Sequence, residues 1–445
     1  MHTLFLTNTF SKEKERFVPL HQKQVTMYVC GITPYDYAHV GHGRVYVCFD
    51  LLYRLLRFLG LNPKYVRNVT DIDDKLLHKA AAVFGDKMRY PELAEKFMAD
   101  FHIQTKKLNC LAPDVEPRAT EYISEMIAMI QTLIQKEHAY VVGSDVYFRV
   151  SSFPEYGKLS HKKVCDLSAG IRVELNEKKE HPADFALWKG AADGEFWKSP
   201  WGYGRPGWHI ECSVMSLANL GETIDIHGGG IDLIFPHHEN EIAQSEATTA
   251  KPFTNYFLHN EFVNLNHEKM SKSIGNVITL GQALIKTNPM VWRFYILQHH
   301  YRMPIDFTEE GLSGAKVAYQ KLVHLTSAPT LSSQELLKIS AENTIVYSLI
   351  SALCDDLNSP KFFGILFEHL SMIKQDKGIG GAVKTILQTI LGLDLEPLEI
   401  PATEEITKLL QDRDAARKKK DWKRADEIRD QLKQCGYEVN DKKVN

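Results

Sequence analysis

Two histidines, His39 and His42, could bind phosphate, because they stand where an expected strand gives way to an expected helix. The strand is VTMYVC (residues 25–30), and the helix shows apolar residues at helical spacing over residues 45–60. The first turn of a helix offers unpaired backbone N–H groups and the positive end of the helix dipole. Two imidazoles there could add hydrogen-bond donors for a polyphosphate. A surface turn that contains two histidines explains so short a motif equally well.

A second basic motif, KMSKS, occupies residues 269–273. Lys269 and Lys272 could close on a phosphate chain and neutralise the charge that grows as pyrophosphate leaves. The alternative is a solvated basic loop. Because five residues are specified, this motif is more specific than the histidine pair.

Four residues of metal-binding type are scattered along the chain: Cys30, Cys212, His237 and Glu241. The last two are four apart in an expected helix (residues 235–250), so they share one face. Cys30 ends a strand, where open α/β sheets bind ligands, and Cys212 lies on a separate expected helix. Two thiolates, an imidazole and a carboxylate suit tetrahedral zinc. The alternative is that the cysteines are small core hydrophobes, and His238 and Glu239 are neighbouring rivals as ligands.

The elements that must position these residues alternate between β-rich and amphipathic helical segments in the first half of the chain. This pattern predicts an α/β fold with a parallel sheet. Residues 151–207 are rich in Gly, Pro, Lys and aromatic residues, so we expect an insertion that lies over the sheet. ETIDIH (residues 222–227) predicts a strand that runs into a loop, GGGIDL. After residue 311 the periodicity indicates a bundle of helices.

Composition excludes several classes of protein. The chain has 445 residues, 44% hydrophobic and 24% charged, which is typical of globular proteins. Seven scattered cysteines without a CxxC pair, no signal peptide and no apolar run long enough for a membrane span predict a cytoplasmic protein that does not bind membranes. A P-loop and a complete GxGxxG fingerprint are both missing.

The net charge of −3 requires any nucleic-acid contact to be local. Between Asp412 and Lys433 nine basic residues face six acidic ones, a local charge of +3, and Trp422 could stack on an unpaired base. A solvated helix face would have the same composition.

HVGH and KMSKS, in this order, resemble the HIGH and KMSKS signatures of the class I aminoacyl-tRNA synthetases. Within that class the chain is similar to the cysteinyl-tRNA synthetases. The similarity is carried by MYVCGITPYDYAHVGHGR, YVRNVTDIDDK, GRPGWHIECSVMS, DIHGGGIDLIFPHHENEIAQSE and KMSKSIGN, and it extends over nearly the whole chain. Two departures are Val40 in place of Ile, and CGIT in place of the commoner CGPT.

The resemblance implies a Rossmann-like parallel sheet with an inserted segment, followed by an α-helical bundle and a small C-terminal tail domain. The expected domains are the first half of the catalytic domain (1–125), the insertion (126–205), the second half (206–255), a KMSKS-bearing region that contacts the tRNA stem (256–310), an anticodon-binding helical bundle (311–398) and a small basic tRNA-binding domain (399–445).

The resemblance also implies which residues act. His39, His42, Lys269 and Lys272 would be catalytic. ATP, bound with Mg²⁺, would contact His39, His42, Lys272, Gly228, Gly229, Gly230 and Asp232. Thr70 and Trp208 would line the cysteine pocket, although both could equally be core residues, and the glycines could form a flexible turn.

One zinc ion per chain, held by Cys30, Cys212, His237 and Glu241, would distinguish the thiol of cysteine from the hydroxyl of serine. An apolar pocket separates such near-isosteres by only about 1–3 kcal/mol. A metal binds a deprotonated thiol strongly, and serine is far less acidic.

The implied function is the activation of L-cysteine with ATP and its transfer to tRNA(Cys) by a monomer. An alternative is a ligase that passes cysteine to an amino sugar, as in mycothiol-type synthesis, since some of those proteins carry the CGITPYD sequence found at residues 30–36. The basic tail favours tRNA. A non-catalytic, zinc-containing RNA-binding protein is a third possibility, but it would not need both phosphate motifs.

Overall fold

The computed structural model describes residues 2–162, 179–265, 268–270, 276–396, 404–419 and 421–434. The chain forms two compact units, Met1–Leu395 and Glu396–Asn445. The predicted sites in the first 395 residues therefore belong to a single unit.

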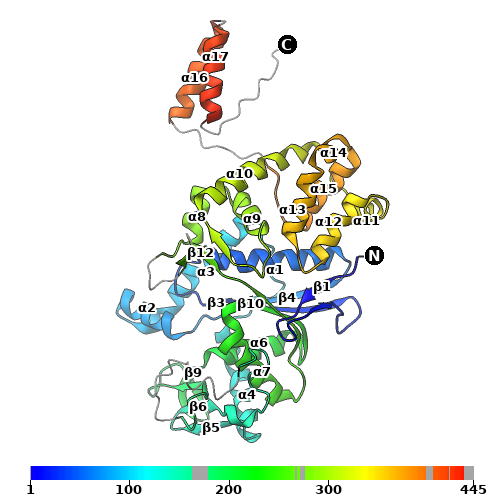
Figure 1. Ribbon diagram of the computed structural model, residues 1–445. Helices are drawn as coiled ribbons and strands as arrows, with labels where there is room; N and C mark the ends of the chain where they lie inside the picture. Colours follow the sequence, from blue (N-terminus) through cyan, green and yellow to red (C-terminus); the bar gives the residue numbers. More distant parts are fainter. Residues whose placement is uncertain are drawn as a thin grey trace. The chain divides into compact units, whose positions relative to one another are not determined.

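The centre of the first unit is a four-stranded parallel sheet in the order β11-β10-β3-β4. The strands are β3 (Gln24–Ile32), β4 (Asn62–Val69), β10 (Ile224–Gly230) and β11 (Thr254–Asn260). Helix α1 (Val40–Phe58) covers one face, and α6 (Trp208–Leu220) and α7 (Glu239–Thr249) cover the other (Figure 1). The prediction of an α/β fold with a parallel sheet is confirmed.

Strand β10 is longer than predicted. Gly228–Gly230 do not form a loop, since they pair with Leu258–Asn260 of β11. A Cβ atom on Gly228 would lie 2.2 Å from the ring of Phe49, so the missing side chain allows α1 to pack closely on the strand. The prediction of a loop was wrong because the need for glycine here arises from the packing of α1, which is far away in the sequence.

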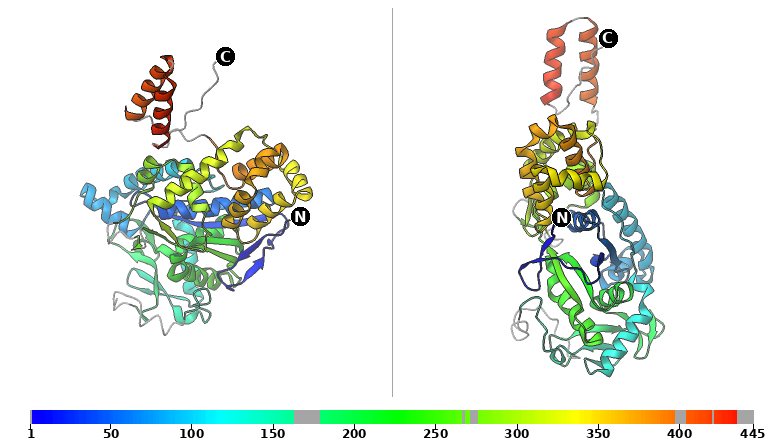
Figure 2. Two further views of the ribbon diagram at one scale, coloured as in Figure 1. Left: turned by 45° about the horizontal axis from the view of Figure 1, so that its top comes forward. Right: turned by 90° about the vertical axis from the view of Figure 1, so that its right-hand side faces the viewer.

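The insertion forms a sheet of its own. Strands β5 (Ala139–Val142), β6 (Asp145–Phe148), β7 (Phe185–Gly190), β8 (Trp197–Ser199) and β9 (Gly202–Pro206) make an antiparallel sheet in the order β5-β6-β7-β9-β8. It lies at the end of the unit away from the helical bundle (Figure 2). The insertion is separate from the central sheet, as predicted, but β7–β9 were not predicted. Their glycines allow close packing, as at Gly204, where a Cβ would lie 2.4 Å from Trp188 Nε1.

Three helices lie between β4 and the insertion: α2 (Asp74–Phe84), α3 (Tyr90–Lys107) and α4 (Ile123–Gln135). A small sheet in the order β13-β12-β14 follows β11 and consists of β12 (Val263–Leu265), β13 (Glu268–Lys269) and β14 (Ile305–Phe307). Helices α8 (Leu280–Lys286) and α9 (Pro289–Leu297) lie in sequence between β13 and β14.

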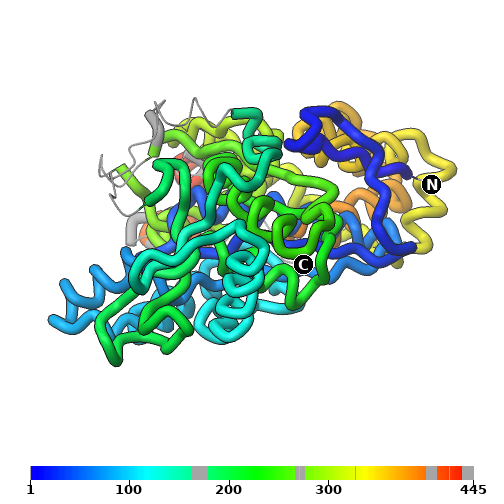
Figure 3. Tube along the Cα trace, turned by 90° about the horizontal axis from the view of Figure 1, so that it is seen from below, coloured from blue at the N-terminus to red at the C-terminus, as the bar shows by residue number. Residues whose placement is uncertain are grey.

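The predicted helical region is α10 (Glu309–Val323), α11 (Ser333–Glu342), α12 (Thr344–Cys354), α13 (Ser359–Glu368), α14 (Leu370–Gln375) and α15 (Lys377–Thr389). The N-terminal hairpin, β1 (Phe5–Thr7) and β2 (Lys14–Arg16), lies beside these helices (Figure 3). The Thr7 hydroxyl donates to the Asp356 carboxylate at 2.6 Å, which ties the chain start to the end of α12.

Where the structure describes the second unit, it shows two helices, α16 (Glu404–Lys418) and α17 (Trp422–Gln434). Ile428 and Leu432 are buried in it, with Leu409 and Leu410 packed against them. Among the described residues of the whole chain, no helix has the length and apolar character needed to cross a bilayer.

Candidate metal centre and nucleotide site

The four predicted metal-binding residues lie together at one edge of the central sheet. Cys30 is near the carboxyl end of β3, Cys212 is in α6, His237 is in the turn before α7, and Glu241 is in α7. The two sulfur atoms are 4.0 Å apart, and His237 Nε2 lies 2.9 Å from Glu241 Oε1. One donor atom from each of the four residues lies within 4.8 Å of all the others, and all four are buried. The structure therefore brings together groups that are far apart in the sequence.

The donor set can be tested against zinc geometry. Zinc–sulfur bonds of about 2.3 Å in a tetrahedron place two sulfurs about 3.8 Å apart. The observed separation of Cys30 and Cys212 is 4.0 Å, and Cys30 Sγ lies 3.9 Å from Glu241 Oε1. Sulfur, nitrogen and oxygen donors in this number are those that zinc prefers. The residues present thus fit a zinc ion.

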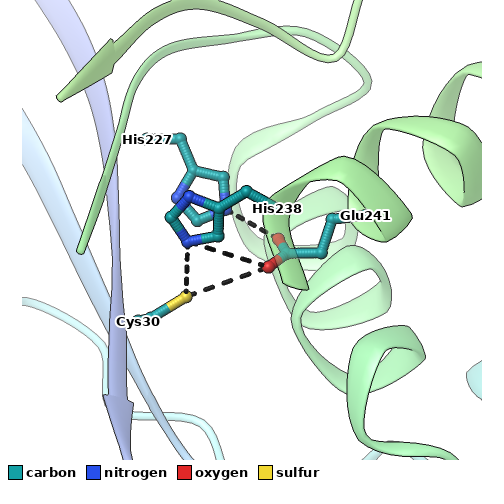
Figure 4. A group of neighbouring side chains, drawn as sticks. All are labelled: Cys30, His227, His238 and Glu241. Carbon is teal, nitrogen blue, oxygen red and sulfur yellow. Dashed lines mark hydrogen bonds and ion pairs between the residues drawn. The ribbon is translucent and has the colours of Figure 1, made fainter. Parts of the chain in front are cut away.

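Further histidines surround this cluster (Figure 4). His227 Nε2 lies 2.6 Å from Glu241 Oε2, and His238 Nε2 lies 3.3 Å from Cys30 Sγ. Together with Cys30 and Glu241 they form a second group whose spacing could hold a metal. Both groups contain the Cys30 thiol and the Glu241 carboxylate. The remaining two metal ligands could therefore be Cys212 and His237, or His227 and His238.

His238 and Glu239, the two alternative ligands that neighbour His237 in the sequence, make different contacts. His238 faces the cluster, and its Nδ1 pairs with His259 Nε2 at 2.8 Å. Glu239 instead accepts hydrogen bonds from the backbone N–H groups of Gly157 and Ser160, at 2.9 and 2.8 Å. Glu239 therefore fastens the insertion to α7, and only His238 competes for a place beside the metal.

The cluster holds its carboxylate ionised. Burial alone would raise the pKa of Glu241, but His227 and His237 lower it to about 2. Burial opposes the charged form of His237, yet Glu241 raises the pKa of this imidazole to about 10. A hydrogen bond with Cys30 lowers the pKa of Cys212 to about 6, whereas burial raises that of Cys30. A carboxylate and one thiolate are thus present at neutral pH, and Cys30 and His237 would each have to release a proton when a metal binds.

Both residues expected to line the cysteine pocket lie beside this cluster. Trp208 begins α6, one turn before Cys212, and its ring stacks on His237 at a centroid distance of 4.1 Å. It is 39% exposed, so one of its faces is available to a ligand. Thr70 is buried just after β4 and donates a hydrogen bond to Glu211, whose pKa burial raises well above its usual value.

The HVGH and KMSKS motifs, which were predicted to bind the nucleotide, approach each other at the start of α1. The rings of His39 and His42 stack at 3.8 Å at the start of α1. The Met270 methyl group lies 3.6 Å from the point where a Cβ on Gly41 would stand, so the two motifs are in contact. Asp232 is exposed in the turn that follows β10. Lys272 lies outside the described residues, and of Lys269 only the backbone is described.

Sequence reasoning missed the buried histidines His227 and His259. His227 lies in β10, next to glycines that were predicted to form a loop, and His259 lies in β11, where no strand was predicted. A histidine within a buried strand needs a polar partner, and this was the available signal. Tyr28 was also missed, although its ring packs edge-on against His227 at 5.2 Å.

Comparison with protein families gives two matches. Residues 16–317 match the model described as "tRNA synthetases class I (C) catalytic domain", and residues 401–445 match the "Cysteinyl-tRNA ligase anticodon binding domain". Curated relatives are similar over almost their entire length. The chain is 43% identical to a cysteine–tRNA ligase of Geobacter metallireducens, covering 99% of this chain and 98% of the relative. It is 46% identical to one of Caldicellulosiruptor saccharolyticus, covering 98% and 97%.

Among solved structures, the fold is similar to that of Mycobacterium tuberculosis methionyl-tRNA synthetase in complex with methionyl-adenylate. The TM-score is 0.59 and the sequence identity is 13%, with 88% of this chain and 94% of that chain covered. A putative arginyl-tRNA synthetase from Campylobacter jejuni gives a TM-score of 0.53 at 13% identity, covering 85% and 94%. At these identities the likeness concerns the fold alone.

Proposed function

The chain belongs to the cysteine–tRNA ligase family of class I synthetases, and on that premise we propose that a zinc ion selects its substrate by the thiol group. In the first step the carboxylate of L-cysteine attacks the α-phosphate of Mg-ATP, giving cysteinyl-adenylate and pyrophosphate. In the second step the 2′-hydroxyl of the terminal adenosine of tRNA(Cys) attacks the activated carbonyl, and AMP leaves.

The observation that carries the zinc proposal is the buried group Cys30, Cys212, His237 and Glu241. These residues would hold one ion per chain, which when bound supplies a soft Lewis acid for the substrate thiolate. Trp208, stacked on His237, would close one side of the cysteine pocket, and Thr70 would close another. Serine would be rejected because its hydroxyl is far less acidic than a thiol.

The nucleotide part of the proposal assigns phosphate binding to His39 and His42. Their position at the first turn of α1 supports it, because this turn adds backbone donors and a favourable dipole. Lys269 and Lys272 would neutralise the charge on the leaving pyrophosphate. Gly228–Gly230 would border the adenosine, and exposed Asp232 would accept from a ribose hydroxyl.

We keep the predicted division of the chain as part of the proposal, with residues 1–125 and 206–255 forming the catalytic domain around the insertion. The family match at residues 401–445 favours tRNA as acceptor over the amino sugar of the alternative ligase. The cytoplasmic location and the monomeric state stay predictions from the sequence.

Two measurements on one preparation test the proposal. The purified protein should contain one zinc per chain by metal analysis and should catalyse ATP–pyrophosphate exchange with cysteine but not with serine. Removing the metal by chelation should abolish the preference for cysteine. Exchange by a metal-free protein that still rejects serine would contradict the role of zinc, and charging of an amino sugar but not of tRNA would contradict the choice of acceptor.

A further inference from the structure

Arg44 lies in the first turns of α1, two residues after His42, and is among the most deeply buried charged residues of the protein. Its exposed fraction is 1%. Its guanidinium faces four backbone carbonyl oxygens. Nη1 donates to Phe262 at 2.5 Å, and Nη2 faces Tyr301 at 3.0 Å, His300 at 3.3 Å and Met303.

These four carbonyls belong to the two segments that lead into the small sheet. Phe262 directly precedes β12, and residues 300–303 directly precede β14. β12 and β14 pair in parallel, with Val263 opposite Ile305. The other edge of β12 pairs with β13, where Asn264 is opposite Lys269. Arg44 therefore connects α1 to the small sheet. The KMSKS motif begins in β13 of this sheet.

The chain also returns to the start of α1 after the motif. The backbone N–H of Leu280 donates to Ala38 at 2.6 Å, and that of Val40 donates to Ile278 at 3.2 Å, on either side of a bridge between His39 and Thr279. The described residues on both sides of the KMSKS motif are thus connected to the helix that carries His39 and His42. Backbone hydrogen bonds connect Ile278 and Leu280 to its start, and Arg44 connects the segments that precede β12 and β14.

Arginine is suited to this place. Its planar group presents five N–H donors in fixed directions, whereas a lysine ammonium is a compact point charge with three. A guanidinium can donate hydrogen bonds to four carbonyl oxygens from two segments, whereas an ammonium group cannot. Burial lowers the pKa of Arg44, and Cys48 and Glu261 oppose this shift.

We propose that Arg44 is a positioning residue for adenylate formation, which sets the separation between the two nucleotide motifs without touching substrate. This inference rests on the proposed function, because it assigns ATP to these motifs. Catalysis of phosphoryl and nucleotidyl transfer depends largely on positioning, and a misplacement of about 1 Å can cost on the order of 100-fold in rate. The metal cluster does not contact Arg44, so cysteine binding depends on different groups.

The test compares Arg44→Met and Arg44→Lys with Arg57→Met, an exposed arginine on the same helix. We expect kcat for cysteine-dependent ATP–pyrophosphate exchange to fall roughly 10- to 100-fold in both Arg44 variants. Bound metal and the KM for cysteine should remain within about twofold of the wild type, because the metal cluster is intact. Arg57→Met should resemble the wild type in all three quantities.

Chemical rescue provides a second measurement. Guanidinium ion at low concentration should restore part of the exchange rate of Arg44→Ala. Methylammonium should not, because it has the same charge but lacks the planar arrangement of N–H donors. An unchanged kcat in the Arg44 variants would overturn the inference. So would a parallel loss of bound metal and cysteine affinity, which would show that Arg44 only supports the fold. If Arg44→Met does not fold, Arg44→Lys decides between these outcomes.

The inference and the proposed function fail in different ways. Absence of cysteine-dependent exchange in the wild-type protein would contradict the proposed function. A wild-type protein that exchanges normally, with Arg44 variants that do so equally well, would contradict the role of Arg44 alone.

Discussion

The sulfur atoms of Cys30 and Cys212 lie 4.0 Å apart, although the two residues are separated by 182 positions in the chain. Cys30 is on β3 and Cys212 is on α6, which packs against this strand. The entire antiparallel sheet of the insertion lies between them in the sequence. Phe148 and Trp188 of the insertion belong to the same apolar core as the two cysteines, so the insertion helps to hold the thiols in place.

We predict that Cys212→Ser loses most of its bound zinc and raises the KM for cysteine tenfold or more, because a hydroxyl is a poor ligand for a soft cation. The KM for ATP should change little. Metal analysis and exchange kinetics measure both effects. Cys354→Ser is the matched control, since Cys354 is buried in α12 and is not a member of either metal-binding group. Full metal content with unchanged cysteine affinity would contradict the prediction.

His227→Gln should weaken zinc binding on the order of 10- to 100-fold, because His227 holds the second oxygen of the Glu241 carboxylate at 2.6 Å. His237→Gln should weaken it more, since it removes a proposed ligand. Competition with a zinc chelator measures both affinities, and His21→Gln, at an exposed position, should have no effect. The reverse order of the two effects would favour the group that contains His227 and His238.

Lys272→Ala should slow adenylate formation while metal content and cysteine affinity remain those of the wild type. The reason is that the lysine would neutralise charge that grows only in the transition state, so kcat should fall more than the KM for ATP rises. Single-turnover formation of cysteinyl-adenylate measures the step. Lys251→Ala, at an exposed lysine that pairs with Glu222 and belongs to neither nucleotide motif, is the control. A variant with the full rate would show that the motif is only a solvated loop.

Deletion of residues 404–445 should raise the KM for tRNA at least tenfold and leave cysteine-dependent exchange intact. The deleted residues form α16 and α17 of the second compact unit, and the predicted metal and nucleotide residues are all in the first. Aminoacylation and exchange assays on the same preparation separate the two activities. Loss of exchange would mean that the catalytic unit needs the deleted helices to fold.

Glu116→Gln should destabilise the protein by about 3–5 kcal/mol, because it leaves a buried cation without its partner. Arg67 donates to Glu116 Oε1 at 2.6 Å, and its guanidinium lies 4.9 Å from the ring centroids of both Tyr46 and Phe101. Denaturant unfolding of both proteins measures the difference. Glu121→Gln, on a nearby turn, should change stability little.

The pH dependence of this difference follows from the pKa of Glu116. Burial would raise it, but His102 and Arg67 together lower it below the ordinary value of 4.5. An acid with a lowered folded-state pKa stabilises the protein above its unfolded-state pKa and loses this contribution as pH falls through the folded-state value. The deficit of Glu116→Gln should thus not shrink between neutral pH and about 4.5, and it should shrink below that pH. A deficit that shrinks between pH 7 and 5 would contradict the assignment.

Local patterns were enough to predict several features. The spacing of His237 and Glu241 predicted their common face, which the 2.9 Å contact bears out. The apolar runs predicted β3 and the first part of β10, whereas β11 was not predicted. Features set by distant partners were not predictable in this way. Gly228 continues a strand because it pairs with Leu258 of β11, and it is a glycine because Phe49 leaves no space for a side chain; nothing near Gly228 in the sequence indicates either.

The buried histidines show the same limit at the site. His227 and His259 have no motif around them, and their place beside Glu241 and His238 follows from the order of β10 and β11 in the sheet. The role of Arg44 likewise depends on four carbonyls that lie more than 200 positions away. The sequence identifies groups that could do chemistry, and the packing determines which of them meet.

If zinc occupies the cluster, its four donors make the ion a tether between β3, α6 and α7 as well as a sensor of sulfur. An ion that binds only the native state adds about 1.4 kcal/mol to its stability for each tenfold excess over its dissociation constant. A cell starved of zinc would then lose folded enzyme together with the means of recognising cysteine. The same ion would thus set both the amount of folded enzyme and its choice of substrate.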